Sequence, residues 1–143
     1  MFVSDILTQK GVRVFTIAPE AGLPDAIDML TTRRIGSVLV IDANGNIAGI
    51  ISERDVVRAI SNQGAAAMSL CVAEAMTTEV VVCDPDDSID QVMAVMTSGR
   101  FRHLPVVRHG ELYGLVSIGD VVKARLEDAH HEAEALKAYI VAS

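Results

Sequence analysis

The chain has 143 residues, half of them hydrophobic, and its 12 basic and 19 acidic side chains give a formal net charge of −7. This length allows one compact domain with its own core, but not two independent domains. The acidic balance argues against a nucleic acid partner, since phosphate backbones bind clustered positive charge. No apolar run approaches the roughly 18 to 20 residues of a membrane span. The first residues lack the pattern of a signal peptide and two cysteines make no disulfide framework, so we expect a cytoplasmic protein.

The first half of the chain predicts alternating short strands and helices. Apolar residues at Leu23, Ala26, Ile27 and Leu30 have the spacing of an amphipathic helix, and Asn44-Gly45 favours a tight hairpin turn because both residues tolerate positive φ. The expected elements, in order, are a helical turn at 3–7, a strand at 12–17, a helix at 23–30, strands at 35–41 and 47–51, and a helix at 52–60.

The second half predicts the same order of elements after a linker at 63–70, where Gly64 and three alanines show no core pattern. We expect the helix that begins near Asp87 or Ser88 to be capped by one of these two residues. The expected elements are a turn at 72–76, a strand at 80–83, a helix from 89 to 96, strands at 101–107 and 112–116 joined by His109-Gly110, and a last helix from Ser117.

A repeat underlies this order. The segment 114–122, with sequence GLVSIGDVV, matches GIISERDVV at 49–57 in its glycine, aliphatic pair, serine, aspartate and valine pair. One such sheet leaves an apolar face uncovered, so we expect two copies to pack about a pseudo-twofold axis, with ligand clefts between them. The predicted fold class is α/β (α+β), with motif 1 at 1–62, the linker at 63–70, motif 2 at 71–125 and a helical extension at 126–143.

The last helix is longer than its counterpart in the first copy. Its apolar residues follow the 4, 3, 4, 3, 4 spacing of a heptad seam, which favours packing along another helix and hence a homodimer. The alternative is that this helix folds back over its own domain. The seam residues are Val122, Leu126, Ala129, Ala133, Leu136 and Ile140.

Both copies place the pattern Ser-x-x-Asp where a strand meets a helix, as Ser52 to Asp55 and as Ser117 to Asp120. One interpretation is a capping box, in which the serine caps the helix and the acidic residue favours the helix dipole. The other uses the same geometry for a ligand. A helix N-terminus offers free N–H groups to a phosphate, and a nearby carboxylate can accept both hydroxyls of a ribose.

These two copies resemble the paired motifs of cystathionine-β-synthase-type (CBS) domains, the tandem called a Bateman module. The resemblance covers roughly residues 3 to 125 and is carried by 35–42 with 49–55, and by 102–107 with 114–120. The chain is similar to the small stand-alone bacterial members of the family. We therefore expect no attached catalytic domain, and the resemblance implies a sensor that binds AMP, ATP, NAD(H) or S-adenosylmethionine.

The resemblance also implies site residues. Asp120 would hold the ribose hydroxyls, Ser117 would contact the ribose-phosphate region, and Arg102 and His103 would face the phosphates, although His103 also fits a neutral core or cap residue. The first copy would supply adenine contacts from Thr16, Ile17, Ala18, Gly36, Ser37 and Val38. A second, weaker cleft would use Ser52, Arg54, Asp55, Val82 and Cys83. Because the first copy has no counterpart of Arg102-His103, the Asp120 cleft is the preferred one.

The sequence thus predicts a non-enzymatic adenine-nucleotide sensor. We expect a homodimer with an unidentified regulated protein partner, and no catalytic cofactor, nucleic acid or membrane. The alternative is a ligand-independent interaction module with vestigial clefts. No cysteine–histidine spacing indicates a nucleophile or a metal site, and Asp84, Asp86 and Asp87 lack the glycine and glutamate of a calcium loop.

Overall fold

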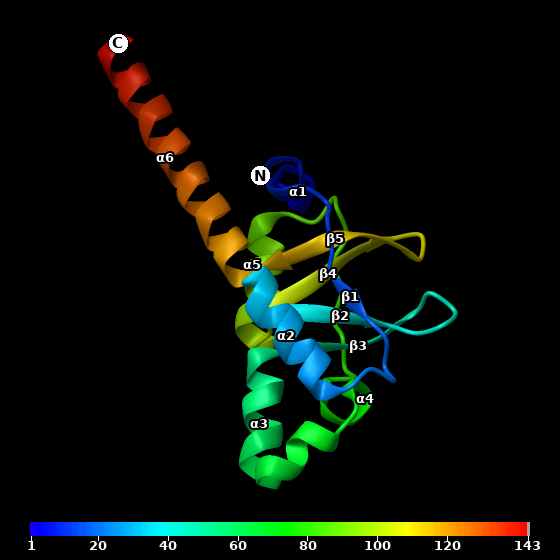
Figure 1. Ribbon diagram of the computed structural model, residues 1–143. Coiled ribbons are helices and arrows are strands. Elements are labelled where there is room, and N and C mark those ends of the chain that lie inside the picture. The colour runs from blue at the N-terminus through cyan, green and yellow to red at the C-terminus, as the bar shows by residue number, and fades with distance from the viewer. Residues whose placement is uncertain (143) are drawn as a thin grey trace. The chain divides into compact units, whose positions relative to one another are not determined.

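The computed structural model describes residues 1–142, and this part of the chain forms two compact units. Unit 1 combines Met1–Arg13 with the residues from Val81 onward, and unit 2 is Val14–Val80. The units do not follow the two repeats, because helix α1 (Val3–Lys10) packs on β5 (Glu111–Ser117) and on α6 (Ile118–Ala142). The predicted fold class is confirmed: small sheets are covered by helices, and the last helix is long (Figure 1).

Unit 2 contains a three-stranded sheet in the order β1-β2-β3, with β1 parallel to β2 and β2 antiparallel to β3. Leu23, Ala26 and Leu30 of α2 are buried, which confirms the predicted helix face. They pack with Val38, Ile51 and other apolar residues in one core. The elements are β1 (Thr16–Ile17), α2 (Leu23–Arg33), β2 (Ser37–Ile41), β3 (Ile47–Ser52), α3 (Glu53–Gln63), the 3-10 helix η1 (Gly64–Ser69) and α4 (Val72–Ala75).

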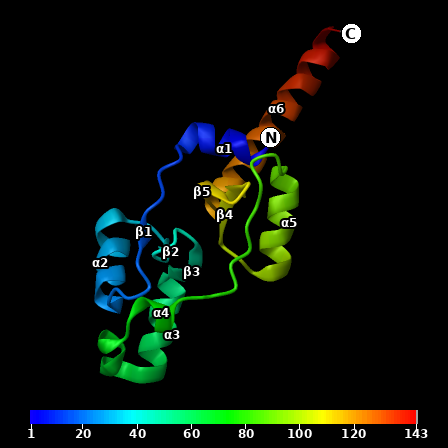
Figure 2. The same cartoon turned by 90° about the vertical axis from the view of Figure 1, so that its right-hand side faces the viewer.

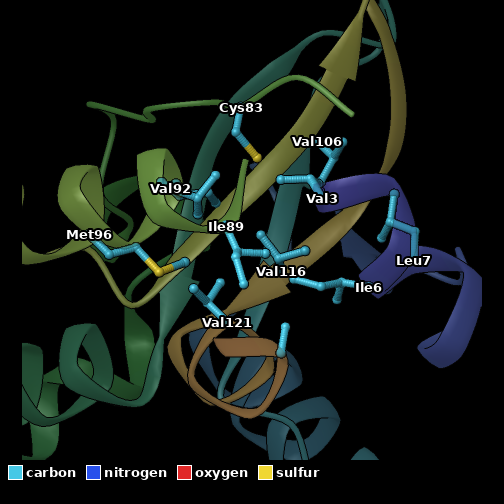
Figure 3. Packing of buried hydrophobic residues seen from close by; sticks show 12 residues of the cluster. Val3, Ile6, Leu7, Cys83, Ile89, Val92, Met96, Val106, Val116 and Val121 are labelled. Carbon is cyan, nitrogen blue, oxygen red and sulfur yellow. The ribbon is translucent and has the colours of Figure 1, made fainter. Parts of the chain in front are cut away.

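Unit 1 contains the antiparallel pair of β4 (His103–Arg108) and β5, surrounded by α1, α5 (Ile89–Gly99) and the start of α6 (Figure 2). Side chains from all of these elements form its core (Figure 3). Ser88 caps α5 through its hydroxyl, which accepts from Gln91 N–H. Of the two predicted capping residues, Ser88 is therefore the cap.

The two hairpin turns differ in backbone geometry. At 44–45 only Gly45 has positive φ, 81°, and Asp42 Oδ1 accepts from the N–H groups of Asn44 and Asn46. At 109–110 both His109 and Gly110 have positive φ. The predicted hairpins are confirmed, but the turn with two positive φ angles is the second one.

Three predicted segments differ from the structure. The strand at 12–17 is reduced to Thr16–Ile17, and the strand at 80–83 is only a parallel bridge from Cys83 to Val106. Each has one neighbour to pair with, and Pro19 and Pro85 end the extended segments. Residues 63–70 are not irregular: α3 continues to Gln63 and η1 follows it, with Ala67 buried in the core of unit 2.

Helix α6 begins in the core of unit 1 and leaves it. Val121 and Ala124 are buried, whereas all residues from 129 to 142 are exposed, and Figure 1 shows this part running away from β4 and β5. Among the described residues, no helix is both long enough and apolar enough to span a membrane.

Candidate functional site

Asp55 and Asp120 occupy the same local position in the two units. Each lies in the first turn of a helix that follows a strand, and each accepts the N–H of the serine three residues before it, at 2.8 Å from Ser52 and 2.9 Å from Ser117. In return each aspartate N–H donates to that serine's hydroxyl oxygen. The motif is therefore a capping box in both copies, as one of the two interpretations predicted.

Asp120 has a neighbour that the sequence did not reveal. Lys10, the last residue of α1, places Nζ 2.6 Å from Asp120 Oδ2 and 3.0 Å from the carbonyl oxygen of Leu115. A small hollow of about 80 Å³ lies here, lined by the polar residues Lys10, Asp120, Lys123 and Gln9 and by the apolar residues Ile6 and Ala124. The Asp120 side chain is 25% exposed. Oδ1 accepts no hydrogen bond from residues 1–142, so one carboxylate oxygen remains for a ligand hydroxyl.

The charge state of Asp120 follows from this environment. Partial burial acts to raise the pKa of Asp120, but the hydrogen bonds from Lys10 and from the Ser117 N–H outweigh it and lower the pKa. The carboxylate therefore stays ionised near neutral pH and acts as a hydrogen-bond acceptor.

Asp55 is engaged much more fully than Asp120. It is 2% exposed, and its Oδ1 accepts from Thr77 Oγ1 at 2.8 Å and from Arg58 at 3.0 Å. Its Oδ2 accepts from both the N–H and the hydroxyl of Ser52. Both oxygens thus hold α3, β3 and the Thr77 segment together, and a ligand hydroxyl would have to displace one of these bonds.

The structure brings the predicted site residues together in two groups. In unit 1, His103 pairs with Ser117 across the β4–β5 ladder, and the Arg102 carbonyl accepts from the Ile118 N–H at 2.8 Å. Arg102, His103, Ser117 and Asp120 therefore gather at one end of the hairpin. The Arg102 side chain is exposed and that of His103 is half-buried.

The predicted adenine contacts belong to unit 2. Thr16 and Ile17 form β1, with Ala18 directly after it, and Ser37 and Val38 begin β2. Ser37 faces Ser52 in the ladder and the Gly36 carbonyl accepts from Glu53 N–H, so Gly36 and Ser37 lie beside the Ser52–Asp55 cap. Thr16 and Ile17 pair further along β2, with Leu39 and Val40. The hydroxyl of Ser37 is buried and has no hydrogen-bond partner within residues 1–142. That these residues share a ligand with Asp120 stays a prediction.

Within the second predicted set, Ser52 and Asp55 lie in unit 2 with Arg54, which is exposed on α3. Val82 in unit 1 is also exposed, at 48%. Cys83 points into the core of unit 1 (Figure 3), and its backbone N–H and carbonyl are bonded to Pro105 and Val107. In this structure Cys83 offers a ligand neither its side chain nor an unpaired backbone group.

Comparison with known proteins agrees with this fold. The family model of the CBS domain matches residues 3–62 and 72–127, so the chain belongs to the CBS-domain family. It is 33% identical over 146 residues to the mitochondrial CBS domain-containing protein CBSX3 of Arabidopsis thaliana, covering 96% of this chain and 71% of that protein.

Solved structures show the same similarity. The CBS-domain containing protein ATU1752 from Agrobacterium tumefaciens is 48% identical, with a TM-score of 0.85 over 87% of this chain and 92% of that one. CBSX2, solved in complex with AMP, is 26% identical, with a TM-score of 0.72 over 90% of this chain and 98% of that one.

Proposed function

We propose that this protein is a non-enzymatic regulatory module that binds an adenine nucleotide, namely AMP, ATP, NAD(H) or S-adenosylmethionine. The observation that carries the proposal is the ionised Asp120 carboxylate, whose Oδ1 has no protein partner in the described chain while Oδ2 is fixed by Lys10 and Ser117. The AMP complex of the related CBSX2 supports the same ligand class.

In this proposal each residue has a distinct task. Asp120 Oδ1 accepts the ribose hydroxyls, and Lys10 holds the carboxylate in place through Oδ2. Arg102 and His103, which lie next to Ser117 at the start of β4, face the phosphates. Ser37 supplies to the adenine a buried hydroxyl that has no hydrogen-bond partner among residues 1–142, and such groups are rare unless a partner binds.

The Asp120 cleft is the principal one. The Asp55 carboxylate already accepts four hydrogen bonds from Ser52, Arg58 and Thr77. A ribose hydroxyl that binds there must displace one of these bonds, so its net binding free energy is smaller than at Asp120. We expect binding at the second cleft to be weaker.

The regulatory output is a change of conformation or partner binding when the nucleotide is bound. We propose that the module acts in the cytoplasm as a homodimer in which α6 contributes to the contact, with a further protein as the regulated partner. The second candidate function is a ligand-independent interaction module, and the closed hydrogen-bond set of Asp55 favours it for that cleft.

Thermal denaturation in the presence of AMP, ATP, NADH and S-adenosylmethionine separates the two functions. A ligand at 100 times its dissociation constant adds about 2.7 kcal/mol to the free energy of unfolding. The sensor function predicts a raised melting temperature with at least one of the four. Unchanged melting temperatures with all four would favour the interaction module.

A further inference from the structure

The distal part of α6 exposes a continuous apolar stripe. Leu126, Leu136 and Ile140 are 66%, 60% and 62% exposed, and Ala129 and Ala133 lie between Leu126 and Leu136 at the same heptad spacing. We name this stripe, together with Val122, the α6 seam. No described residue of unit 1 covers it beyond residue 128, so it is an apolar surface of the kind that marks an interaction site.

The α6 seam is separate from the face that anchors the helix. Val121 and Ala124 pack into the core of unit 1, and at about 100° per residue the seam lies roughly 120° around the helix from them. The anchor is reinforced by Arg125, which pairs with Asp90 of α5 at 3.4 Å. The helix can therefore stay fixed in its own subunit while the α6 seam contacts another molecule.

The charged residues beside the α6 seam favour one relative orientation of two α6 helices. If the seam residues are the a and d positions of a heptad, Arg125 and Glu132 occupy g positions on one side, and Lys123, His130 and Lys137 occupy e positions on the other. In a parallel pair of helices each residue of the first side meets the residue five positions on in the second copy. Glu132 of each copy then meets Lys137 of the other, which gives two attractive pairs, and Arg125 of each copy meets His130 of the other.

An antiparallel pair places different charges together. Lys123 would meet Lys137 of the second copy at both ends, and Glu132 would meet its own equivalent at the centre. Like charges in such flanking positions destabilise a pair of helices and direct partner choice. We infer that two copies of this chain associate through the α6 seam with their α6 helices parallel, a step that rests on the homodimer part of the proposed function.

The ion pairs that Glu132 and Lys137 make within one chain do not prevent them from pairing between two copies. Glu132 is 3.9 Å from Arg125, and Lys137 is 3.5 Å from Glu134. The Glu132 and Lys137 side chains are 72% and 73% exposed, so both bonds are solvated and weak. Either can be replaced by a contact across the dimer.

A charge-reversing substitution distinguishes the parallel from the antiparallel pair, because it weakens one dimer and strengthens the other. The dimer dissociation constant of the full chain is measured by sedimentation equilibrium at low salt, without nucleotide. Lys137→Glu should weaken a parallel dimer about tenfold, since two attractive pairs become repulsive. The double variant Glu132→Lys/Lys137→Glu should restore wild-type affinity. A tighter dimer with Lys137→Glu would contradict the parallel arrangement, because that change relieves the antiparallel Lys123–Lys137 repulsion.

Cross-linking provides a second test. In a Cys71→Ser background, Ile140→Cys should form a disulfide between copies, because the same residue of each helix meets in a parallel pair. In an antiparallel pair the two cysteines would lie about 27 Å apart, so no cross-link would refute the proposal. A wild-type chain that remains monomeric at 100 times the concentration used for nucleotide titration would also refute it. Neither readout depends on nucleotide binding, so failure here is distinguishable from failure of the sensor function.

Discussion

The two repeated aspartates should respond differently to the same substitution. Asp55→Ala removes a carboxylate that is 2% exposed and accepts four hydrogen bonds. Ser52 still caps α3, because its hydroxyl can accept the N–H of residue 55. The Ser52 N–H loses its acceptor, however, which costs about 1 kcal/mol. The Thr77 hydroxyl, which donates to the carboxylate, contributes a further charge-assisted bond of about 1.5 to 3 kcal/mol. Arg58 is 62% exposed and regains water when its partner is lost. We expect a total destabilisation of about 2.5 to 4 kcal/mol.

Asp120→Ala likewise leaves Ser117 as the cap of α6 and removes only the acceptor of the Ser117 N–H. The other partner that Asp120 loses is Lys10. The Lys10 ion pair joins side chains that are 38% and 25% exposed, and pairs of this kind contribute little. The expected loss is therefore about 1 kcal/mol, mostly from the Ser117 N–H that loses its acceptor.

Urea denaturation followed by circular dichroism measures both losses. Asp55→Asn is the control for Asp55, because the amide oxygen can still accept from Thr77 and should retain part of the stability. Equal destabilisation by Asp55→Ala and Asp120→Ala would refute the claim that one aspartate is structural and the other is available to a ligand.

Two further predictions concern the packing of the repeats. A Cβ on Gly49 would lie 2.6 Å from the carbonyl oxygen of Thr77, whereas one on Gly114 would meet the end of the flexible Leu7 side chain. Gly49→Ala should therefore lower the midpoint of urea denaturation more than Gly114→Ala. The reverse order would contradict the close packing of β3 on the Thr77 backbone. Burial, together with nearby acidic residues, raises the pKa of the Cys83 thiol to about 12, so iodoacetamide at pH 8 should modify native protein at Cys71 alone, as read by mass spectrometry. Modification of Cys83 before unfolding would show that its core position is wrong.

The sequence repeat predicted most of the local structure. The helix faces, the hairpins and both Ser-x-x-Asp caps depend on residues close together in the chain, so a single sequence carries enough information for them. The segments that differ are those whose state depends on a distant neighbour. The extended segments before Pro19 and Pro85 each pair with only one strand, and Ala67 is helical because it packs into the core of unit 2.

The site was predictable in part for the same reason. The repeated motif identifies Asp120 and Asp55 as equivalent, but nothing in it shows that Lys10, 110 residues away, forms an ion pair with one of them. Nor does it show that Thr77 and Arg58 complete the bonds of the other. The difference between the two aspartates is therefore a tertiary property.

Isothermal titration of AMP into the full chain tests the central claim most directly. Asp120→Ala should weaken AMP binding about tenfold to a hundredfold, the equivalent of one charge-assisted hydrogen bond of roughly 1.5 to 3 kcal/mol. Glu134→Ala, which removes an exposed carboxylate of the same helix, should leave the affinity unchanged. Wild-type AMP affinity in Asp120→Ala would contradict the assignment of Asp120 as the ribose-binding residue.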